Sequence, residues 1–358
     1  MRPFRPYSAS AFIILSLLLA VLTVFCVVPA FSQAPFYQGK TITLIVGSGA
    51  GGMGDLRAKA IASVLAKHIP GKPNITLQYM PGGGGRKAAN HLYNSARADG
   101  LTLYRISSSI VPYAVLGESG VQYDIDKLIY LGTTEHVLYY LFGTRKEVGL
   151  DTLARLRAAS GVRIGSAPVG HTGYIHSRVT AYLLDMKEPR IIPGYENEDL
   201  DLAFARGEVD AQVASTGTVV EHNLVNKKLV DFHAAIEHPK GNKDPRFAHL
   251  GLPDIANFAK SEKEKKLLNM MRDFRSIGTA LLLPPGTPKD RVDILKEAVR
   301  KTHTDPAFIN DYRKMTGGDE PTPLMPDEQA KVVKEIPRDP ETIELFKKFA
   351  GTGPLPPR

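Results

Sequence analysis

Short β-branched runs that end at glycine- or serine-rich loops, each followed by an amphipathic helix, recur along the sequence. The run Thr41–Val46 ends at a glycine cluster, after which apolar residues recur at helical spacing between Leu56 and His68. Further elements are expected as strands at Ile75–Met80 and Leu101–Ile106 and as a helix at about Arg86–Ala98. This alternation predicts a parallel sheet covered by helices.

The same order of elements returns in the middle of the chain and again near its end. Strands are expected at Val162–Gly165, Arg190–Pro193, Val209–Ala214 and Ala280–Leu283. Helices are expected at Tyr174–Leu184, Leu200–Ala205, Lys289–His303, Pro306–Met315, Pro326–Ile336 and Pro340–Phe349. A chain of 358 residues is long enough for two domains with cores of their own.

The N-terminal segment has the three parts of a secretory signal. Arg2 and Arg5 precede the apolar run Ala11–Val28, and Ser32 and Ala34 are the small residues of a cleavage site. We expect residues 1–34 to be a signal peptide that is removed after about Ala34. An uncleaved membrane anchor is the alternative, because about 18 apolar residues could just span a bilayer.

The composition is that of an ordinary globular protein, with 43% apolar and 23% charged residues. The single cysteine, Cys26, lies in the expected signal peptide, so the chain cannot be a disulfide scaffold or a cysteine-rich zinc module. The formal charge is +8, and removal of the expected signal peptide with its two Arg leaves 8 − 2 = +6. This charge could concentrate small anions or could belong to an ordinary solvated surface. Export disfavours nucleic acid as a partner.

Several loops are suited to holding an anion. In an open parallel sheet, ligands bind beyond the carboxyl ends of the strands, where unpaired N–H groups begin each helix. The loops in question are Gly47–Asp55, Pro81–Gly85, Ser107–Ser109, Ser166–Thr172 and Ser215–Thr218, and Asp55 is their only acid. They predict a carboxylate or phosphate site made mainly of neutral donors, although each loop alone could be an ordinary strand-to-helix turn.

Other chemistry is poorly supported. Gly47–Gly52 matches the G-x-G-x-x-G dinucleotide pattern, but the next strand ends in Gln78-Tyr79-Met80, without the carboxylate that binds a ribose. The five-residue spacing of His171 and His176 does not put two metal ligands on one helix face. Asp55 is better placed to stabilise a helix N-terminus than to act in catalysis. We expect no catalytic residue, metal or cofactor.

The order of several motifs resembles the extracytoplasmic receptors of tripartite tricarboxylate transporters, the Bug or TctC-type receptors. The resemblance covers Lys40 to about Val333. The segments that carry it are Thr41–Asp55, Met80–Gly85 (their "RPGAGG"), Ala98–Leu103 ("PDGYTL"), Tyr123–Ile125 ("YDP"), Gly165–Gly170 ("GSSGNG"), Gly194–Tyr195 ("PYKG"), Ala205–Asp210 ("AGQVD") and Leu283–Pro288 ("APAGTP").

This resemblance implies a two-lobed α/β fold, the type-2 periplasmic binding-protein fold, with a mostly parallel sheet flanked by helices in each lobe and the ligand cleft between them. Residues 35–136 and 238–358 would form the first lobe and residues 137–237 the second, with crossings near Glu135–Tyr139 and Ile236–Pro239. The resemblance also implies that two loops hold a ligand carboxylate, chiefly through backbone N–H groups and ordered water.

Carried over to this sequence, the implied ligand-binding residues lie in the loops named above. Those of the first half are Ser48, Gly49, Ala50, Gly51, Gly52, Met53, Asp55, Gly83, Gly84, Ser107 and Ser108. Those of the second half are Ser166, Ala167, Val169, Gly170, His171, Thr172, Tyr195, Ser215 and Thr216.

One departure from the family pattern bears on the ligand. Many members carry, after the strand at Val209–Ala214, an Asp that accepts the ammonium group of amino-acid ligands, and this chain has Ser215 there. An unneutralised ammonium group would be costly in a closed cleft, so we expect a mono- or dicarboxylate without an amino group, aromatic ones included. The expected protein is a periplasmic monomer that delivers this ligand to a tripartite tricarboxylate-type permease. A receptor for a sensor kinase and a dinucleotide-binding oxidoreductase are the alternatives.

Overall fold

The computed structural model describes residues 34–107, 109–195, 197–215 and 224–358. The expected signal peptide, except for Ala34, lies outside these ranges, and so does the alternative of an uncleaved anchor. Among the helices within these ranges, none has both the length and the apolar character needed to cross a bilayer.

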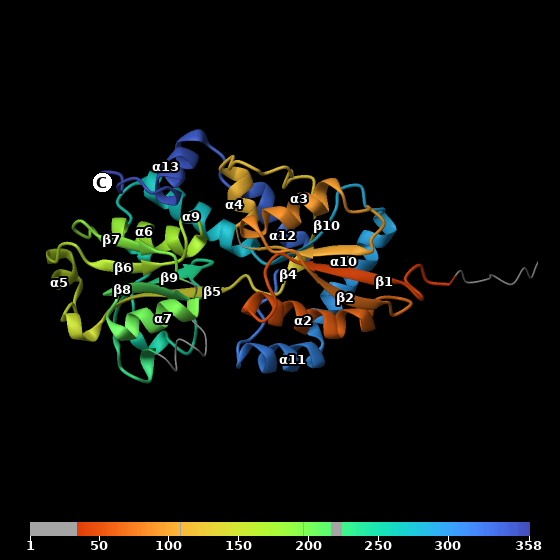
Figure 1. Ribbon diagram of the computed structural model, residues 1–358, viewed down its shortest axis with the longest axis horizontal. Coiled ribbons are helices and arrows are strands. Elements are labelled where there is room, and N and C mark those ends of the chain that lie inside the picture. Colours follow the sequence, from red (N-terminus) through yellow and green to blue (C-terminus); the bar gives the residue numbers. More distant parts are fainter. Residues whose placement is uncertain (1–33, 108, 196, 216–223) are drawn as a thin grey trace, which may run out of the picture. The chain divides into compact units, whose positions relative to one another are not determined.

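The first sheet has five strands in the order β2 (Asn74–Tyr79), β1 (Thr41–Val46), β3 (Thr102–Arg105), β10 (Ala280–Leu283) and β4 (Ile129–Thr133) (Figure 1). Strand β1 pairs in parallel with β2 and β3, and β10 pairs antiparallel with both β3 and β4. Four strands therefore run in one direction, and β10, which comes from far along the chain, runs in the other.

The second sheet repeats this arrangement. Its order is β7 (Arg190–Pro193), β6 (Arg163–Ser166), β8 (Ala211–Ser215), β5 (Leu138–Arg145) and β9 (Val230–His238). Strand β6 pairs in parallel with β7 and β8, whereas β5 pairs antiparallel with β8 and β9. The reversed strand thus holds the fourth place in both sheets.

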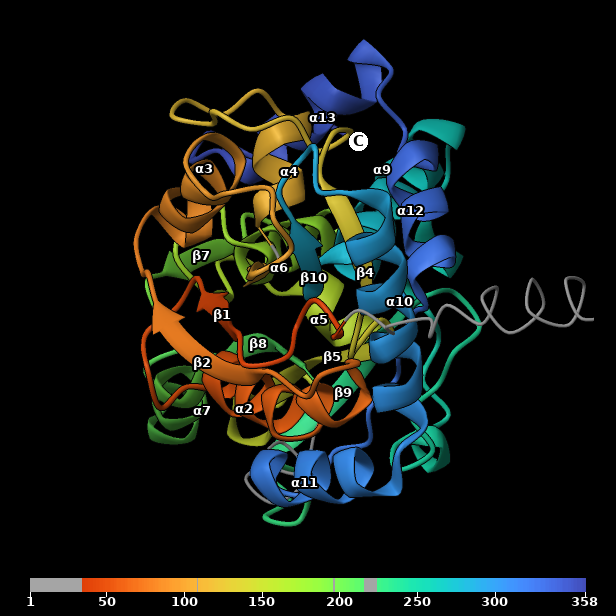
Figure 2. The same ribbon diagram turned by 90° about the vertical axis from the view of Figure 1, so that its right-hand side faces the viewer.

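Helices flank each sheet. Around the first sheet, α2 (Met53–Leu65), α10 (Lys289–Thr304) and α11 (Pro306–Thr316) pack against one another, while α3 (Arg86–Asn94) packs on β3 and α12 (Pro326–Glu335) on β4 (Figure 2). On the second sheet, α6 (Thr172–Leu183) packs on β6 and β8, as does α7 (Asn197–Arg206). The shorter helices are α4 (Ile110–Val115) and α5 (Leu153–Ala158).

The chain passes from the first sheet to the second between β4 and β5, and it returns after β9 through α9 (Glu262–Ile277) to β10. Two sheets flanked by helices confirm the predicted two-lobed α/β class. We propose 35–136 with 238–358, and 137–237, as the lobes. The last helix, α13 (Pro340–Ala350), belongs to the proposed first lobe by sequence, but it packs against α6.

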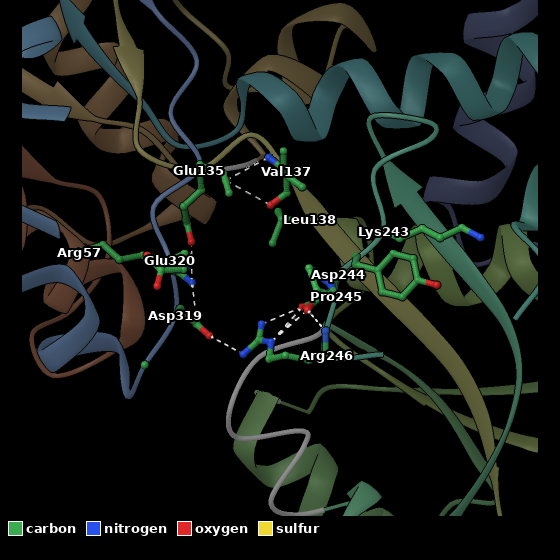
Figure 3. Close-up of a pocket in the computed structure, with 13 residues that line it drawn as sticks. Arg57, Glu135, Val137, Leu138, Lys243, Asp244, Pro245, Arg246, Asp319 and Glu320 are labelled. Carbon is green, nitrogen blue, oxygen red and sulfur yellow. Dashed lines mark hydrogen bonds and ion pairs between the residues drawn. The ribbon is translucent and has the colours of Figure 1, made fainter. Parts of the chain in front are cut away.

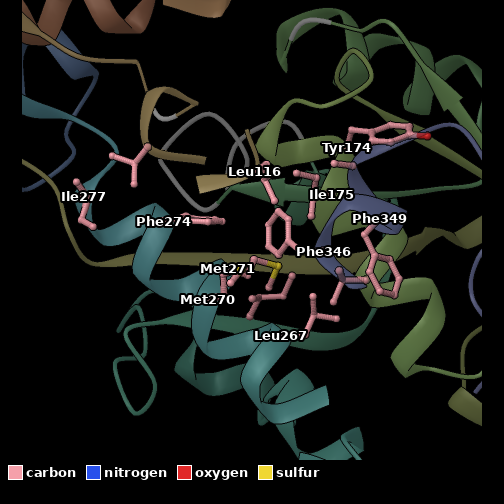
Figure 4. Packing of buried hydrophobic residues seen from close by; sticks show 14 of the residues in the cluster. Leu116, Tyr174, Ile175, Leu267, Met270, Met271, Phe274, Ile277, Phe346 and Phe349 are labelled. Atoms are coloured by element: carbon pink, nitrogen blue, oxygen red, sulfur yellow. The ribbon is translucent and has the colours of Figure 1, made fainter. Parts of the chain in front are cut away.

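A core of aromatic and aliphatic side chains joins α9 to α13. The rings of Phe274 and Phe346 meet edge to face, with their centroids 5.1 Å apart at 85°. Ile175 of α6 and Met271 belong to the same buried cluster (Figure 4). The C-terminal helix is therefore held by apolar packing to both α9 and α6.

Some predicted elements have the predicted bounds and others do not. The structure has strands with the predicted bounds at Thr41–Val46, Arg190–Pro193 and Ala280–Leu283. The helix predicted to continue to Ala98 is wrong at its end: it stops at Asn94, because the N–H groups of Ser95 and Ala96 both donate to the carbonyl oxygen of His91 and close the last turn.

Candidate functional site

The carboxyl ends of parallel strands from both sheets meet at a cleft of about 300 Å³. Val46 ends β1 and Arg105 ends β3 in the first sheet, and Val213 and Ser215 lie at the end of β8 in the second. This is the position at which open α/β sheets bind ligands. The cleft is thus the candidate site, and both sheets contribute to it.

Two helices begin at the cleft, one from each sheet. Helix α2 follows Gly52, and its residues Met53 and Gly54 line the cleft. Helix α6 follows His171, whose Nδ1 accepts a hydrogen bond of 3.1 Å from the N–H of Gly173. The first turn of a helix carries unpaired N–H groups and a partial positive charge, so both ends favour an anion.

Three arginines also line the cleft: Arg57 of α2, Arg105 of β3 and Arg275 of α9. Arg105 and Arg275 are only 6% and 7% exposed. The Nε of Arg275 donates to the hydroxyl oxygen of Tyr140 on β5 at 3.1 Å. Among the described residues that line the cleft there is no Asp or Glu, so its lining is strongly cationic.

One carboxylate, that of Glu135 in the crossing between the sheets, lies beside these arginines. It is 2.6 Å from the Nη2 of Arg57 and 4.0 Å from that of Arg105. Burial lowers the pKa of Arg105, and the charges of Arg57 and Arg275 lower it further, while Glu135 opposes the shift. Burial also acts to lower the pKa of Arg57. Glu135 and the other acidic groups near Arg57 outweigh this effect, so the pKa of Arg57 is raised overall. Arginine is effectively always protonated in proteins, so Arg57 and Arg105 are both cationic at neutral pH.

The carboxylate of Asp55 holds the first glycine loop in place. It is fully buried and accepts hydrogen bonds from the Gly51 N–H at 2.7 Å, from Lys59 Nζ at 2.8 Å and from the Tyr79 hydroxyl at 2.7 Å. Burial acts to raise the pKa of Asp55, but the bonds from Lys59, Gly51 and Tyr79 hold it below its usual value. Gly51 has a φ of 92°, a conformation that glycine adopts without strain. These contacts favour the interpretation that Asp55 stabilises the start of α2.

The tetraglycine segment packs behind the first loop. The buried hydroxyl of Tyr104 donates to the carbonyl oxygen of Gly85 at 3.1 Å. A Cβ added at Gly47 would lie 2.6 Å from that same hydroxyl, so only glycine allows the first loop this close to Tyr104. The segment therefore supports the loop through Tyr104.

The structure brings together only some of the residues predicted for the site. Those that line the cleft are Ser48, Met53, Ser107, His171, Thr172 and Ser215. Those that are described but are not among its lining residues are Gly49, Ala50, Gly51, Gly52, Asp55, Gly83, Gly84, Ser166, Ala167, Val169, Gly170 and Tyr195. Ser108 and Thr216 lie outside the described residues.

The prediction of mainly neutral donors missed the three guanidinium groups. Arg105 could have been noticed, because it is a charged residue at the end of an otherwise buried strand. Arg57 lies one helical turn after Met53, which also places it near the loop. Arg275 carries no such signal, since it is brought to the cleft from a distant helix by the fold alone.

A second pocket, of about 410 Å³, lies on another side of Arg57 (Figure 3). Asp319, which follows α11, is 3.3 Å from the Nη1 of Arg246, and Arg246 also pairs with Asp244 at 2.7 Å. Glu135 lines this pocket too. Carboxylates and guanidinium groups neutralise one another here, so this pocket is less favourable for binding an anion than the cleft is.

The histidines do not form a metal site in the described part of the chain, where no group of three or more His, Cys, Asp or Glu could hold an ion. His171 caps α6. His176 is buried beside Tyr140, with ring centroids 4.5 Å apart, and burial together with the charge of Arg275 lowers its pKa to about 3. A neutral, buried imidazole ring of this kind indicates that His176 is part of the protein core.

Comparison with known sequences gives one informative relative. A UPF0065 protein of Bordetella bronchiseptica is 24% identical over 313 residues, which cover 84% of this chain and 84% of that protein. No protein-family model matches the chain.

Several solved structures share the fold. The periplasmic binding protein BugD matches with a TM-score of 0.62 at 18% identity, covering 87% of this chain and 98% of its own. A TctC solute binding protein from Polaromonas gives 0.62 at 17% identity, with the same coverage of 87% and 98%. MatC from Rhodopseudomonas palustris, with bound malate, gives 0.59 at 20% identity and covers 87% and 99%. These comparisons agree with the resemblance found in the sequence motifs, and they show that the chain has the fold of the periplasmic binding proteins.

Proposed function

We propose that the chain is a periplasmic receptor that captures a small carboxylate in the cleft between its two sheets and delivers it to a tripartite tricarboxylate-type permease. The observation that carries this proposal is the make-up of the cleft. Two helix N-termini and three arginines converge there, and no acidic residue among the described ones lines it. Such a lining stabilises an anion and disfavours a cation.

Capture would involve hinge closure, the motion that periplasmic binding proteins use around their ligands. Met53 and Arg105 come from the first sheet and its helix, whereas Thr172 and Ser215 come from the second. A ligand that touches both groups stabilises the closed state more than the open one, which shifts the population toward closure.

The cleft chemistry also supports a ligand without an amino group. Val213 and Ser215 occupy the end of β8, where the resemblance places the Asp that neutralises an ammonium group in other receptors. Near Arg105 and Arg275 an ammonium group would meet like charge as well as desolvation. The malate bound to MatC is a carboxylate of the class proposed here.

The proposed role is binding, without catalysis. Against the oxidoreductase alternative, β10 runs antiparallel within the first sheet, whereas the dinucleotide-binding fold uses parallel strands in the order 3-2-1-4-5-6. In addition, β2 ends in Tyr79, whose hydroxyl donates to Asp55, so no carboxylate ends this strand to hold a ribose.

A thermal-shift screen of the chain without residues 1–34 tests the proposal. Aliphatic and aromatic carboxylates are compared with the corresponding amides and amines at equal concentration. At least one carboxylate should raise the unfolding midpoint, because a ligand at about 100 times its Kd adds about 2.7 kcal/mol to stability. Amides or amines that stabilise the protein as well as the acids do would contradict it.

A further inference from the structure

Two residues that are not among those lining the cleft form an ion pair between segments that belong to different sheets. The Nη1 of Arg246 lies 3.3 Å from the Oδ1 of Asp319, across the pocket shown in Figure 3. We propose that this pair is a latch: it holds the two halves of the molecule, each built around one sheet, in the arrangement described above.

Arg246 is carried by the second sheet. It follows β9, and its neighbour Phe247 is buried in a cluster with Leu141 of β5 and Ala235 of β9. The range proposed for the first lobe includes this segment by sequence, but the segment packs on the second sheet. The carboxylate of Asp244 accepts hydrogen bonds from the Nε of Arg246 at 3.0 Å and from its Nη2 at 2.7 Å. This fork fixes the guanidinium group and leaves Nη1 for Asp319.

Asp319 is carried by the first sheet. It follows α11, which packs against α2. A few residues later the chain pairs with the end of β4, where the N–H of Leu324 donates to the carbonyl oxygen of Thr133 at 3.1 Å. The Nη2 of Arg57, on α2, lies 4.0 Å from the Oδ2 of Asp319. The carboxylate of Asp319 thus has one cation in its own half and another in the opposite half.

The latch can open at modest cost, because neither charge is left without a partner. When the two halves separate, Arg246 keeps Asp244, and Asp319 keeps Arg57. The side chains of Arg246 and Asp319 are 34% and 18% exposed, so water also reaches both. A partly exposed pair of this kind biases an equilibrium without locking it, whereas breaking a fully buried pair strands a charge.

The latch gives residues outside the cleft an influence on ligand binding. Arg57 and Leu138 line both the cleft and the pocket that the latch crosses. A movement that separates the two halves at the latch therefore changes the cleft as well. The population of the arrangement in which both sheets meet at the cleft sets the apparent affinity of any ligand that touches both sheets.

Electron paramagnetic resonance of the spin-labelled, ligand-free chain without residues 1–34 tests the latch. This chain has no cysteine, so labels can be placed at the exposed positions Lys314→Cys and His249→Cys, within a few residues of Asp319 and Arg246. Asp319→Asn should raise the ratio of long to short label distances about two- to fivefold, as expected for the loss of a partly exposed ion pair. Asp319→Glu keeps the carboxylate and should stay close to the original ratio. Because no ligand is present, the result does not depend on the outcome of the thermal-shift screen.

Glu320→Gln is the matched control. Glu320 is the adjacent acid, but it pairs with Arg313 of α11 at 2.6 Å, within its own half, so its replacement should leave the label distances unchanged. If Arg246→Gln and Asp319→Asn act through one contact, the double variant should change no more than either single variant does. Identical distance distributions in Asp319→Asn and Glu320→Gln, or changes that add up in the double variant, would overturn the inference.

Discussion

The Nη2 of Arg57 lies 2.6 Å from the Oε1 of Glu135, and Arg57 lines both the candidate cleft and the pocket shown in Figure 3. Glu135 lies in the crossing between β4 and β5, so this ion pair connects the cleft to the segment that joins the two sheets. Glu135 also offsets part of the positive charge of Arg57 and Arg105 at the candidate cleft.

Removing this carboxylate should destabilise the protein and strengthen anion binding. Breaking a buried ion pair by removing one partner costs about 3–5 kcal/mol, so Glu135→Gln should lower the free energy of unfolding by about that amount. The same change leaves more positive charge in the cleft, which should tighten binding of the carboxylate that stabilises the protein most in the thermal-shift screen. Urea unfolding and calorimetry measure the two effects. Glu297→Gln, at an exposed site, is the control, and a Glu135→Gln variant that behaves like it would refute the role given to this pair.

The first loop should tolerate alanine at Gly49 but not at Gly51. Gly51 has a φ of 92° and donates to Asp55, and a side chain in that conformation costs about 1–3 kcal/mol. A Cβ at Gly49 meets nothing within 4 Å, and its φ is not in the positive region. Gly51→Ala should therefore lower both stability and carboxylate affinity, while Gly49→Ala leaves stability nearly unchanged. Equal unfolding midpoints for the two variants would count against this loop geometry.

Acid should destabilise the protein partly through His303. Burial lowers the pKa of His303 to about 4, below the value of about 6.5 in an unfolded chain. Between these values the unfolded state binds a proton that the folded state does not, so stability falls as the pH falls from about 6.5 to about 4. His303→Phe should remove about 1.4 kcal/mol per pH unit from that slope in urea unfolding. The exposed His249→Gln is the control, and an unchanged slope in His303→Phe would show that His303 is protonated in the folded state.

The C-terminal helix should be essential to stability. Phe346 of α13 is buried against Phe274 of α9 (Figure 4), and truncating such a side chain costs about 3–5 kcal/mol. Phe346→Ala should lower the free energy of unfolding by this amount, whereas Leu202→Ala, at an exposed position of α7, should change it by about 0.5 kcal/mol at most. A small loss in Phe346→Ala would mean that α13 does not belong to the core.

Local sequence signals were sufficient to predict the strands and helices that alternate regularly along the chain. The run Thr41–Val46 is apolar and β-branched and is followed by a glycine loop, and the structure has a strand with the same bounds. Strand β9 was not predicted, because it carries Asp231, His233 and Glu237 in a largely buried segment. The partner of His233 comes from a distant strand, since its ring bonds to the Thr144 hydroxyl at 2.8 Å, whereas the carboxylate of Glu237 accepts from the nearby Gly241 N–H at 2.8 Å.

Only those parts of the candidate site that depend on local sequence patterns could be predicted. Glycine and serine loops after strands indicate helix N-termini, and Ser48, Ser107 and Thr172 do line the cleft. The arginines could not be assigned in the same way, because Arg275 is 170 positions from Arg105 and reaches the cleft through tertiary packing of α9. Charge that converges from distant elements leaves no periodic pattern in a sequence.

The most direct test of the account is a crystal structure of the chain without residues 1–34 in complex with the carboxylate that raises its unfolding midpoint most in the thermal-shift screen. We predict a carboxylate group of this ligand within hydrogen-bond distance of at least one of Arg57, Arg105 and Arg275, with further contacts from the ligand to residues of both sheets. A ligand bound outside this cleft, or held by one sheet alone, would contradict the account.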